Sequence, residues 1–203
     1  QNHEYAYSTA EGPWLNYLWA SLTPWITAVD SADGRVFELG CGNGATAGML
    51  GSLGFKVTAV DPSISGITIA KASHLNAAFE TASTHDDLAA RFGTFPLLVS
   101  LEVVEHCYAP REFAKSVFNL LEPGGKALIS TPYHGYLKNL VLAITGKLDA
   151  HFTALWDGGH IKFWSMKTLN TLLTEVGFEQ VEFRRVGRIS PLAKSMVAIV
   201  TKP

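Results

Sequence analysis

The stretch that decides the fold is Val36-Phe37-Glu38-Leu39-Gly40-Cys41-Gly42-Asn43-Gly44. Its first four residues are mostly apolar and predict a buried strand, whereas residues 45–50 follow a helical pattern. Between them, Gly40, Gly42 and Gly44 stand at alternate positions. A strand that turns sharply into a helix over glycine presents free backbone N–H groups to a ligand, because a Cβ would block the turn and the close approach. The stretch therefore predicts a ligand-binding turn.

An acidic residue follows the next strand. That strand is predicted over residues 55–60 and ends in Asp61. A carboxylate at this edge of a sheet lies where a bound ribose would present its two hydroxyls. The glycines are spaced GxGxG rather than GxGxxG, the spacing of dinucleotide-binding turns, and Glu38 stands two residues before Gly40. An NAD-binding turn and a tight turn without a ligand remain as alternatives.

Two segments carry a family resemblance. Residues 38–44 and Val60-Asp61-Pro62-Ser63 resemble the two cofactor motifs of the class I S-adenosylmethionine-dependent methyltransferases. The resemblance covers essentially the whole chain, since Leu121-Glu122-Pro123-Gly124-Gly125 resembles the family's turn before strand five. It implies S-adenosylmethionine as the cofactor, with Asp61 on the ribose and Ser83 in place of the aspartate that often bonds the adenine. The full set of implied cofactor-binding residues is Glu38, Gly40, Cys41, Gly42, Gly44, Asp61, Pro62, Ser63, Ser83 and Leu101.

Composition limits the class of protein. The 203 residues, 47% hydrophobic and 17% charged, predict a single domain over 1–203. A net charge of −2 makes nucleic acid an unfavourable main partner. Cys41 and Cys107 indicate reduced thiols and hence a cytoplasmic protein. No signal peptide is expected, because the apolar patch at 14–29 is broken by Pro24 and lacks a basic leader, and no run reaches transmembrane length.

Strands and helices alternate along the chain. Strands are predicted at 36–39, 55–60, 77–82, 96–101, 126–130, 178–185 and 195–201, and helices at 63–75, 86–92, 112–121 and 168–176. This alternation requires a parallel, doubly wound α/β sheet, in which the last two strands run antiparallel because a short loop joins them. The family resemblance implies a three-layer Rossmann-like fold with seven strands in the order 3-2-1-4-5-7-6 and strand seven reversed.

Two further segments lie outside this core. Residues 1–30 are expected to form an N-terminal helical cap over the cofactor cleft, with one or two helices between 12 and 29. Tyr5, Tyr7 and Trp14 are candidates for stacking on a ligand, although an aromatic helix face also suits a core. Residues 132–164 are expected to form an insert that acts as a substrate lid. A membrane-contacting amphipathic segment and an extra helix on the sheet are the alternatives.

A second cluster of polar residues follows strand four. If the chain turns helical there, Glu102 has Glu105 and His106 three and four positions ahead, and His160 in a later loop offers a fourth ligand. Such a set suits Mg²⁺, Mn²⁺ or Zn²⁺. The pattern resembles the metal-binding set of the small-RNA 2′-O-methyltransferases, and with residues 130–164 it is similar to the ubiquinone-biosynthesis O-methyltransferases. Alternatively, the glutamates only cap helices or order loops.

These features predict an S-adenosylmethionine-dependent O-methyltransferase that acts on a small hydroxylated, apolar molecule. A metal would lower the pKa of the substrate hydroxyl; without one, His160 or His106 would act as the general base. An RNA 2′-O-methyltransferase and a catalytically silent cofactor-binding module that regulates a partner remain as alternatives. His134 and His151 flank the insert and receive no role, and the oligomeric state is not predicted.

Overall fold

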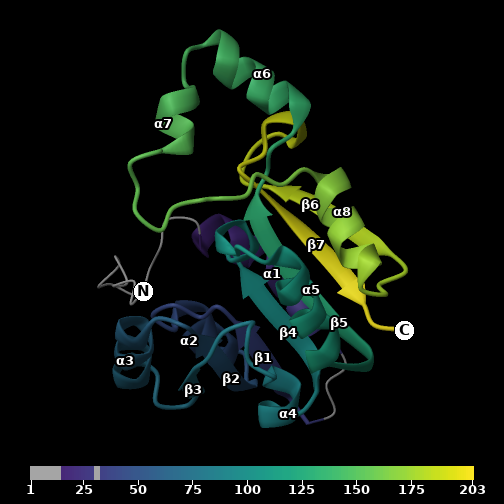
Figure 1. The fold of residues 1–203 in the computed structure, drawn as a ribbon. Helices are drawn as coiled ribbons and strands as arrows, with labels where there is room; N and C mark the ends of the chain where they lie inside the picture. The colour runs from purple at the N-terminus through teal and green to yellow at the C-terminus, as the bar shows by residue number, and fades with distance from the viewer. Residues whose placement is uncertain (1–14, 30–32) are drawn as a thin grey trace.

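A seven-stranded mixed sheet forms the centre of the molecule in the computed structural model, which describes residues 15–29 and 33–203 (Figure 1). The strand order is β3-β2-β1-β4-β5-β7-β6, and β7 runs antiparallel to both β5 and β6. The strands are β1 (Arg35–Leu39), β2 (Lys56–Asp61), β3 (Ala78–Thr81), β4 (Phe95–Leu101), β5 (Leu121–Pro132), β6 (Val181–Val186) and β7 (Ser195–Thr201). The predicted fold class and strand order are confirmed.

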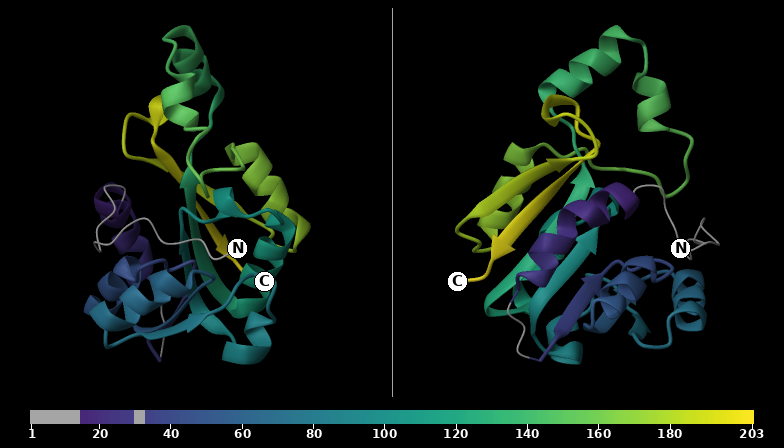
Figure 2. Two further views of the ribbon diagram at one scale, coloured as in Figure 1. Left: turned by 60° about the vertical axis from the view of Figure 1, so that its left-hand side comes forward. Right: turned by 180° about the vertical axis from the view of Figure 1, so that it is seen from behind.

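Helices cover both faces of the sheet (Figure 2). Helices α1 (Leu15–Thr27), α2 (Ala45–Ser52) and α3 (Ile64–Ser73) bury their apolar side chains on one face. Helices α4 (Leu88–Phe92), α5 (Pro110–Leu120) and α8 (Met166–Glu175) do so on the other. Successive strand residues point to opposite faces, so Val36 and Phe37 of β1 enter different clusters and are both fully buried.

The N-terminal segment differs in part from the expected cap. Its described part is one helix, α1, with Pro24 inside it. Leu18, Leu22 and Ile26 of α1 are buried in the apolar cluster on the sheet, so this helix is a layer of the fold. Tyr5, Tyr7 and Trp14 lie outside the described residues.

The predicted turn at 122–125 lies within β5. The partner of Phe95 is Leu121, whereas the partner of Leu97 is Lys126, so the register shifts by several residues. Gly124 has a φ of +79°, which suits glycine. The segment is therefore an irregularity inside the strand and not a separate turn before it.

The insert extends beyond the carboxyl ends of the strands (Figure 1). It contains α6 (Tyr136–Ile144) and α7 (Leu148–Phe152), and α6 contacts both α7 and the 3₁₀ helix η2 (Ser190–Leu192). A short 3₁₀ helix, η1 (Val104–His106), follows β4 at the base of this region. Among the described residues, every helix is too short or too polar to cross a bilayer.

Candidate functional site

The glycine turn after β1 depends on the absence of side chains. Gly40, Gly42 and Gly44 have φ values of +84°, +53° and +83°, a region that L residues rarely adopt. A Cβ on Gly44 would lie 2.8 Å from the Cβ of Ala70 in α3. A Cβ on Gly66, also in α3, would lie 2.8 Å from the carbonyl oxygen of Gly42. The turn and α3 can pack together only because both sides lack a Cβ at these contacts.

The N–H groups of this turn are already bonded within the chain. Gly40 and Cys41 donate to the carbonyl oxygen of Val60, at 2.8 and 3.0 Å. The N–H of Gly42 donates to Oδ2 of Asp61 at 2.9 Å. The prediction of free N–H groups is wrong at these three positions, because the end of β2 accepts their hydrogen bonds. At Gly40 and Gly44 the missing Cβ makes room for Val103 and Ala70 of the chain itself.

Asp61 connects the turn to α3. Its Oδ1 accepts the N–H of Ser63 at 2.8 Å, and the Ser63 hydroxyl caps α3 by accepting the N–H of Gly66 at 3.1 Å. Burial raises the pKa of Asp61, whereas the N–H bonds from Ser63 and Gly42 oppose the rise. Each carboxylate oxygen retains a second lone pair, so Asp61 can still accept hydrogen bonds from a ribose. That role stays a prediction.

Glu38 and Cys41 lie beneath the turn. Glu38 is 3% exposed; the Thr46 hydroxyl and the N–H of Ala47 at the start of α2 lower the pKa of its carboxyl group, and its Oε2 has no hydrogen-bond partner among the described residues. Burial, followed by the charge of Asp61, raises the pKa of Glu38 to about 8. Glu38 therefore holds α2 against β1 and orders the turn. Burial also raises the pKa of the Cys41 thiol, which remains unreactive in the core.

Ser83 and Leu101 have structural roles in the described chain. The N–H of Ser83 donates to Oδ2 of Asp86 at 2.7 Å, which closes the loop after β3. Leu101 is buried at the end of β4 in the same apolar cluster as Cys41. Their proposed contacts with the adenine or the methyl group stay predictions.

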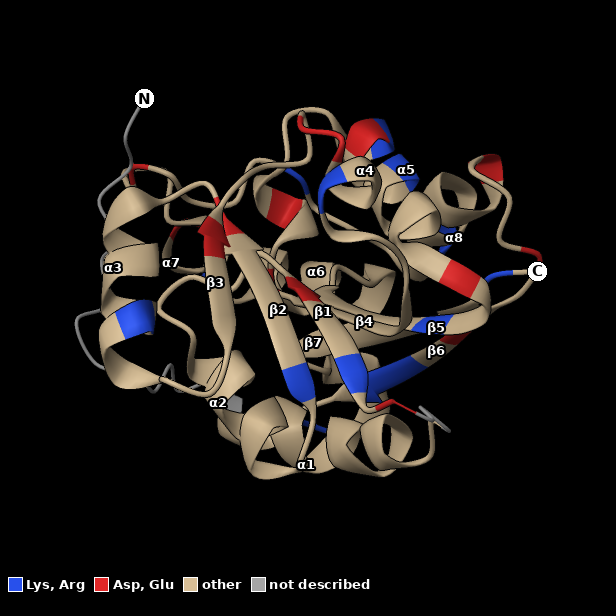
Figure 3. Ribbon diagram, turned by 90° about the horizontal axis from the view of Figure 1, so that it is seen from below, with Lys and Arg blue, Asp and Glu red and all other residues tan. Residues whose placement is uncertain are grey.

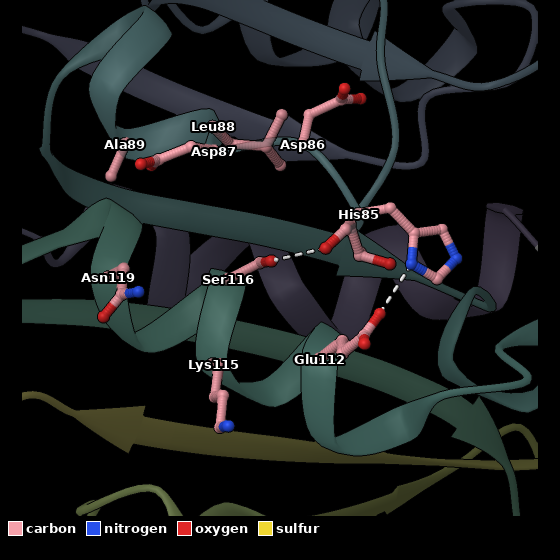
Figure 4. A pocket seen from close by; sticks show the side chains of 10 residues that line it. His85, Asp86, Asp87, Leu88, Ala89, Glu112, Lys115, Ser116 and Asn119 are labelled. Atoms are coloured by element: carbon pink, nitrogen blue, oxygen red, sulfur yellow. Dashed lines mark hydrogen bonds and ion pairs between the residues drawn. The ribbon is translucent and has the colours of Figure 1, made fainter.

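A hollow of about 350 Å³ lies beside this loop, between α4 and α5 (Figure 4). In the close-up, Glu112 of α5 points toward His85, and their side chains approach to 2.6 Å. The lining is polar and shares no residue with the glycine turn. It is therefore separate from the glycine turn.

Three predicted metal ligands meet at the carboxyl end of β4. One ligand atom each from Glu105, His106 and His160 lies within 4.8 Å of the others. Nε2 of His160 is 3.9 Å from Oε1 of Glu105, and the two imidazole rings are 4.9 Å apart. We call these three residues the Glu–His–His cluster.

Backbone hydrogen bonds bring His160 to η1. The N–H groups of Ile161 and Lys162 both donate to the carbonyl oxygen of Glu105 at 3.0 Å. The indole N–H of Trp164 donates to the carbonyl oxygen of Val104 at 3.3 Å. The segment after α7 is thus hydrogen-bonded to η1, and this places His160 beside Glu105.

The hydrogen bonds of His106 fix its tautomer. Nδ1 lies 2.9 Å from the carbonyl oxygen of Gly158 and 3.2 Å from that of Gly159. Because carbonyl oxygens only accept, Nδ1 carries the proton and Nε2 keeps a free lone pair. Burial lowers the pKa of His106 and, with the charge of His106, lowers that of His160 to about 4. Both rings are neutral at pH 7, the form that binds metals or accepts protons.

The Glu105 side chain is 1% exposed, and neither carboxylate oxygen has a hydrogen-bond partner of normal geometry, although the Thr131 hydroxyl lies near enough to lower its pKa. Burial, and next the charge of Glu102, raise its pKa well above the usual range. A buried carboxylate without partners is costly unless a cation or proton neutralises it. One carboxylate and two neutral imidazoles form a donor set that fits a divalent ion, Zn²⁺ or Mn²⁺ better than Mg²⁺.

Glu102, the fourth predicted ligand, lies outside this cluster. Helical structure begins only at Val104, and Glu102 has a φ of +56°, so the predicted helical spacing is wrong. Its Oε1 accepts the Ser130 hydroxyl at 2.8 Å, and its Oε2 is 3.4 Å from the Ser195 hydroxyl. Burial raises its pKa to about 7. The left-handed backbone directs this carboxylate toward β5 and β7.

Sequence reasoning gave no role to three residues near the cluster. Thr131, His134 and His151 each carry a buried polar atom without a partner in the protein. Thr131 and His134 come at the end of β5, the same sheet edge as the glycine turn. Glu102 was singled out because it is a polar residue at the carboxyl end of a sheet strand. The same criterion applies to Thr131 and His134.

A model of the methyltransferase domain matches residues 12–182. The chain belongs to the methyltransferase domain family. Curated relatives of this methyltransferase domain are named ubiquinone biosynthesis O-methyltransferase. The protein from Caulobacter sp. (strain K31) is 36% identical over 127 residues, 60% of this chain and 48% of the relative. That from Burkholderia pseudomallei (strain 1710b) is 30% identical over 176 residues, 84% of this chain and 75% of the relative. The chain spans about half the length of the first relatives it matches.

The fold is shared with solved methyltransferases. Magnesium protoporphyrin IX methyltransferase from Synechocystis PCC 6803, solved with bound SAH, superposes with a TM-score of 0.67. It is 17% identical, and the match covers 91% of this chain and 81% of the Synechocystis chain. This similarity supports the architecture of the methyltransferase domain.

Proposed function

We propose that this domain transfers a methyl group from S-adenosylmethionine to a hydroxyl oxygen of a small molecule. The observation that carries the proposal is the position of the Glu–His–His cluster. It follows β4, the neighbour of β1 in the sheet, so it shares the carboxyl edge with the glycine turn. The names of the curated relatives support O-methylation.

The turn fits the proposed cofactor, which supplies a methyl group already activated on a sulfonium. The positive φ values of Gly40, Gly42 and Gly44 form the sharp turn at the sheet edge where this cofactor is proposed to bind. Asp61 retains acceptor capacity for the ribose hydroxyls. Glu38 fixes the turn from below through α2.

The Glu–His–His cluster would hold a divalent cation, and the unpaired carboxylate of Glu105 is the reason. Such an ion lowers the pKa of a hydroxyl that it binds. The chain itself would position the substrate oxygen and exclude water under the insert. Without the ion, Nε2 of His106 would be free to accept the proton of the hydroxyl. Catechols and vicinal diols, with two adjacent oxygens, suit this arrangement.

The test is the melting temperature with S-adenosylhomocysteine, with and without Mg²⁺, Mn²⁺ or Zn²⁺, for the wild type and His160→Ala. A cation that binds the native state adds about 2.7 kcal/mol at one hundred times its Kd. We expect this shift in the wild type and its loss in the variant. His85→Ala, an exposed histidine outside the cluster, is the control. Absence of a shift in the wild type would leave histidine as the only base.

Methyl transfer to catechol, followed with labelled cofactor, tests the reaction itself. Cofactor binding without turnover across a broad screen of hydroxylated molecules would favour the silent regulatory module. No feature of the described residues points to that module.

The insert is proposed to contact a membrane surface. On α6 the exposed apolar residues are Tyr136, Leu137, Leu140, Val141 and Ile144. Their spacing places them on one side of the helix. Helix α6 itself stands away from the sheet (Figure 2). We expect co-sedimentation with phosphatidylcholine vesicles that contain anionic lipid, and its loss in Leu140→Glu/Ile144→Glu. Equal sedimentation of both proteins would contradict the contact.

RNA 2′-O-methylation has less support. The chain has three arginines close in sequence, Arg184, Arg185 and Arg188. Arg184 lies over the ring of Trp25 and pairs with Glu182, and Arg185 lies over the ring of Tyr133, so two of the three have intramolecular partners. In Figure 3, segments with Lys or Arg and segments with Asp or Glu are interspersed along the ribbon. Affinity for RNA that falls steeply with salt would restore this alternative.

A further inference from the structure

Glu102 has an unusual backbone conformation for its residue type. Among the described residues, Glu102 and Thr153 are the only two that have a positive φ without being glycine. The φ of +56° at Glu102 lies in the left-handed region, where the Cβ of an L residue comes too close to its own backbone. Such a conformation persists only where the surrounding structure holds it, and it occurs preferentially at functional sites. The contacts that hold Glu102 therefore indicate what this backbone serves.

Ser130 holds both the backbone and the carboxylate of Glu102. The N–H of Glu102 donates to the Ser130 carbonyl oxygen at 3.1 Å and to the Ser130 hydroxyl oxygen at 3.0 Å. The same hydroxyl donates to Oε1 of Glu102 at 2.8 Å. These bonds close a ring that fixes the backbone and the side chain of Glu102 together. Because Ser130 is fully buried in β5, the ring is attached to the centre of the sheet.

The second carboxylate oxygen of Glu102 has a partner from another strand. Oε2 lies 3.4 Å from the hydroxyl of Ser195, which is 1% exposed at the start of β7. The Ser195 hydroxyl lies 3.0 Å from that of Tyr17 in α1. Both oxygens of Glu102 are thus bonded within the chain, whereas those of Glu105 lack a partner of normal geometry. Glu102 therefore has the surroundings of a structural carboxylate, and Glu105 those of a ligand.

The chain leads directly from Glu102 to the cluster. The Val103 side chain lies against the glycine turn, since a Cβ on Gly40 would be 2.5 Å from Cγ2 of Val103. The carbonyl oxygen of Val103 accepts the N–H of His106 at 2.9 Å, which closes η1. Because an ordinary negative φ at Glu102 would send the chain in another direction, the left-handed backbone decides where Glu105 and His106 lie.

We propose that Glu102 is a positioning residue whose hydrogen-bonded carboxylate holds the left-handed backbone that brings Glu105 and His106 into the Glu–His–His cluster. The carboxylate of Glu102 acts through Ser130 and Ser195 and does not itself bind the cation. The inference rests on the proposed function, because it assumes that the cluster binds a cation. It gives the two neighbouring carboxylates different roles: that of Glu105 binds the ion, and that of Glu102 orders the chain that carries Glu105.

Three substitutions of Glu102 separate positioning from direct binding. The probe is Zn²⁺, titrated by calorimetry into the full chain with S-adenosylhomocysteine present. Glu102→Ala loses the hydrogen bonds but keeps a Cβ at positive φ, so Zn²⁺ should bind about ten-fold or more weakly. Glu102→Gln keeps a polar group for both serines, so affinity should stay within about three-fold. Glu102→Gly adopts the positive φ without strain, so it should bind Zn²⁺ more tightly than Glu102→Ala.

A second measurement needs no cation. In the wild type, Nδ1 of His106 carries the proton that the carbonyl oxygen of Gly158 accepts. NMR spectra of the imidazole nitrogens report this tautomer. We expect the wild-type signals of His106 in Glu102→Gln and altered signals in Glu102→Ala, because η1 moves when its first residues are released. Unaltered signals in Glu102→Ala would contradict the positioning role.

The controls separate this role from folding and from the proposed function. Glu122→Ala removes a carboxylate that pairs with Arg35 at the start of β1, and it should bind Zn²⁺ as the wild type does. A variant counts as folded when it binds S-adenosylhomocysteine normally; if Glu102→Ala does not fold, Ser130→Ala decides. Binding in Glu102→Gln as weak as in Glu102→Ala, or wild-type binding in Glu102→Ala, overturns the proposal. Absence of Zn²⁺ binding in the wild type refutes the cation of the proposed function alone, and the imidazole signals then decide the positioning role.

Discussion

Two regions lie at the carboxyl edge of the sheet: the cofactor half, where the cofactor is proposed to bind, and the substrate half, where the substrate is proposed to bind. The two are built differently. In the cofactor half, the turn after β1 is hydrogen-bonded to the end of β2: the N–H groups of Gly40, Cys41 and Gly42 donate to Val60 and Asp61. In the substrate half, η1, the end of β5 and the insert hold six of the eight unpaired buried atoms of the described residues. The other two belong to Glu38 and His74.

This difference indicates where a ligand is needed to complete the structure. The cofactor turn is preorganised by contacts within the chain, so cofactor binding requires little rearrangement of polar groups. The substrate half keeps polar groups desolvated without partners, so a cation and a substrate should stabilise it most. Substitutions in the cofactor half should therefore change cofactor affinity, whereas substitutions in the substrate half should change methyl transfer and the cation-dependent melting shift.

Glu105→Gln should have the largest effect, confined to the substrate half. Loss of the buried carboxylate removes a cluster ligand, and methyl transfer should fall by about 10³-fold, in the range of lost catalytic groups. Affinity for S-adenosylhomocysteine should stay within about two-fold, because the cofactor half is intact. Single-turnover rates and calorimetry measure the two quantities. A parallel loss of both would show that the halves are not independent.

Asp61→Ala should have the converse effect. It removes the acceptor for the N–H groups of Gly42 and Ser63, and with it the proposed ribose contact. Hydrogen bonds to a charged group contribute about 1.5–3 kcal/mol, so affinity for S-adenosylhomocysteine should fall about a hundred-fold. The cation-dependent melting shift should persist. Asp87→Ala, which removes the carboxylate that accepts the N–H of Ala90 at the start of α4, is the matched control. Unchanged affinity in Asp61→Ala would remove Asp61 from the cofactor site.

Glu38→Gln should change how stability depends on pH. The pKa of Glu38 rises from 4.5 to about 8 on folding, so between these values the native state holds a proton that the unfolded chain releases. Stability from this group is therefore present at low pH and lost as pH rises through the window. The variant should flatten this decline by up to about 1.4 kcal/mol per pH unit. The free energy of unfolding in urea, measured between pH 4.5 and about 8, gives this dependence for both proteins. If the free energy changes with pH by the same amount in the wild type and the variant, the proton is held by another group.

Ser165→Ala should have the smallest effect and leave both halves unchanged. The Ser165 hydroxyl accepts the N–H of Thr168 in the capping box of α8. Loss of such a cap costs about 1 kcal/mol, which lowers the melting temperature of a chain this size by about 2–4 °C. Cofactor affinity and methyl transfer should be unaffected, and a change in either would mean that α8 supports the site.

Most of the fold could be predicted, because the strand and helix patterns are local. Residues 36–44 and Asp61 predicted the turn, its neighbour strand and the cofactor class. The details that failed are tertiary. Residues 122–125 pass into β5 through a register shift, and the N–H groups of the turn are bonded to the end of β2.

The sequence alone determined the cofactor half, since its parts lie within one strand-helix-strand unit whose glycines and acids act on their near neighbours. Only the tertiary structure decided the substrate half. Hydrogen bonds from His106 to Gly158 and from Ile161 to Glu105 bring His160 into place across more than fifty residues. The left-handed backbone at Glu102 directs its carboxylate away from the Glu–His–His cluster. Such long-range contacts leave no periodic signal in the sequence, because they depend on how the insert returns to η1.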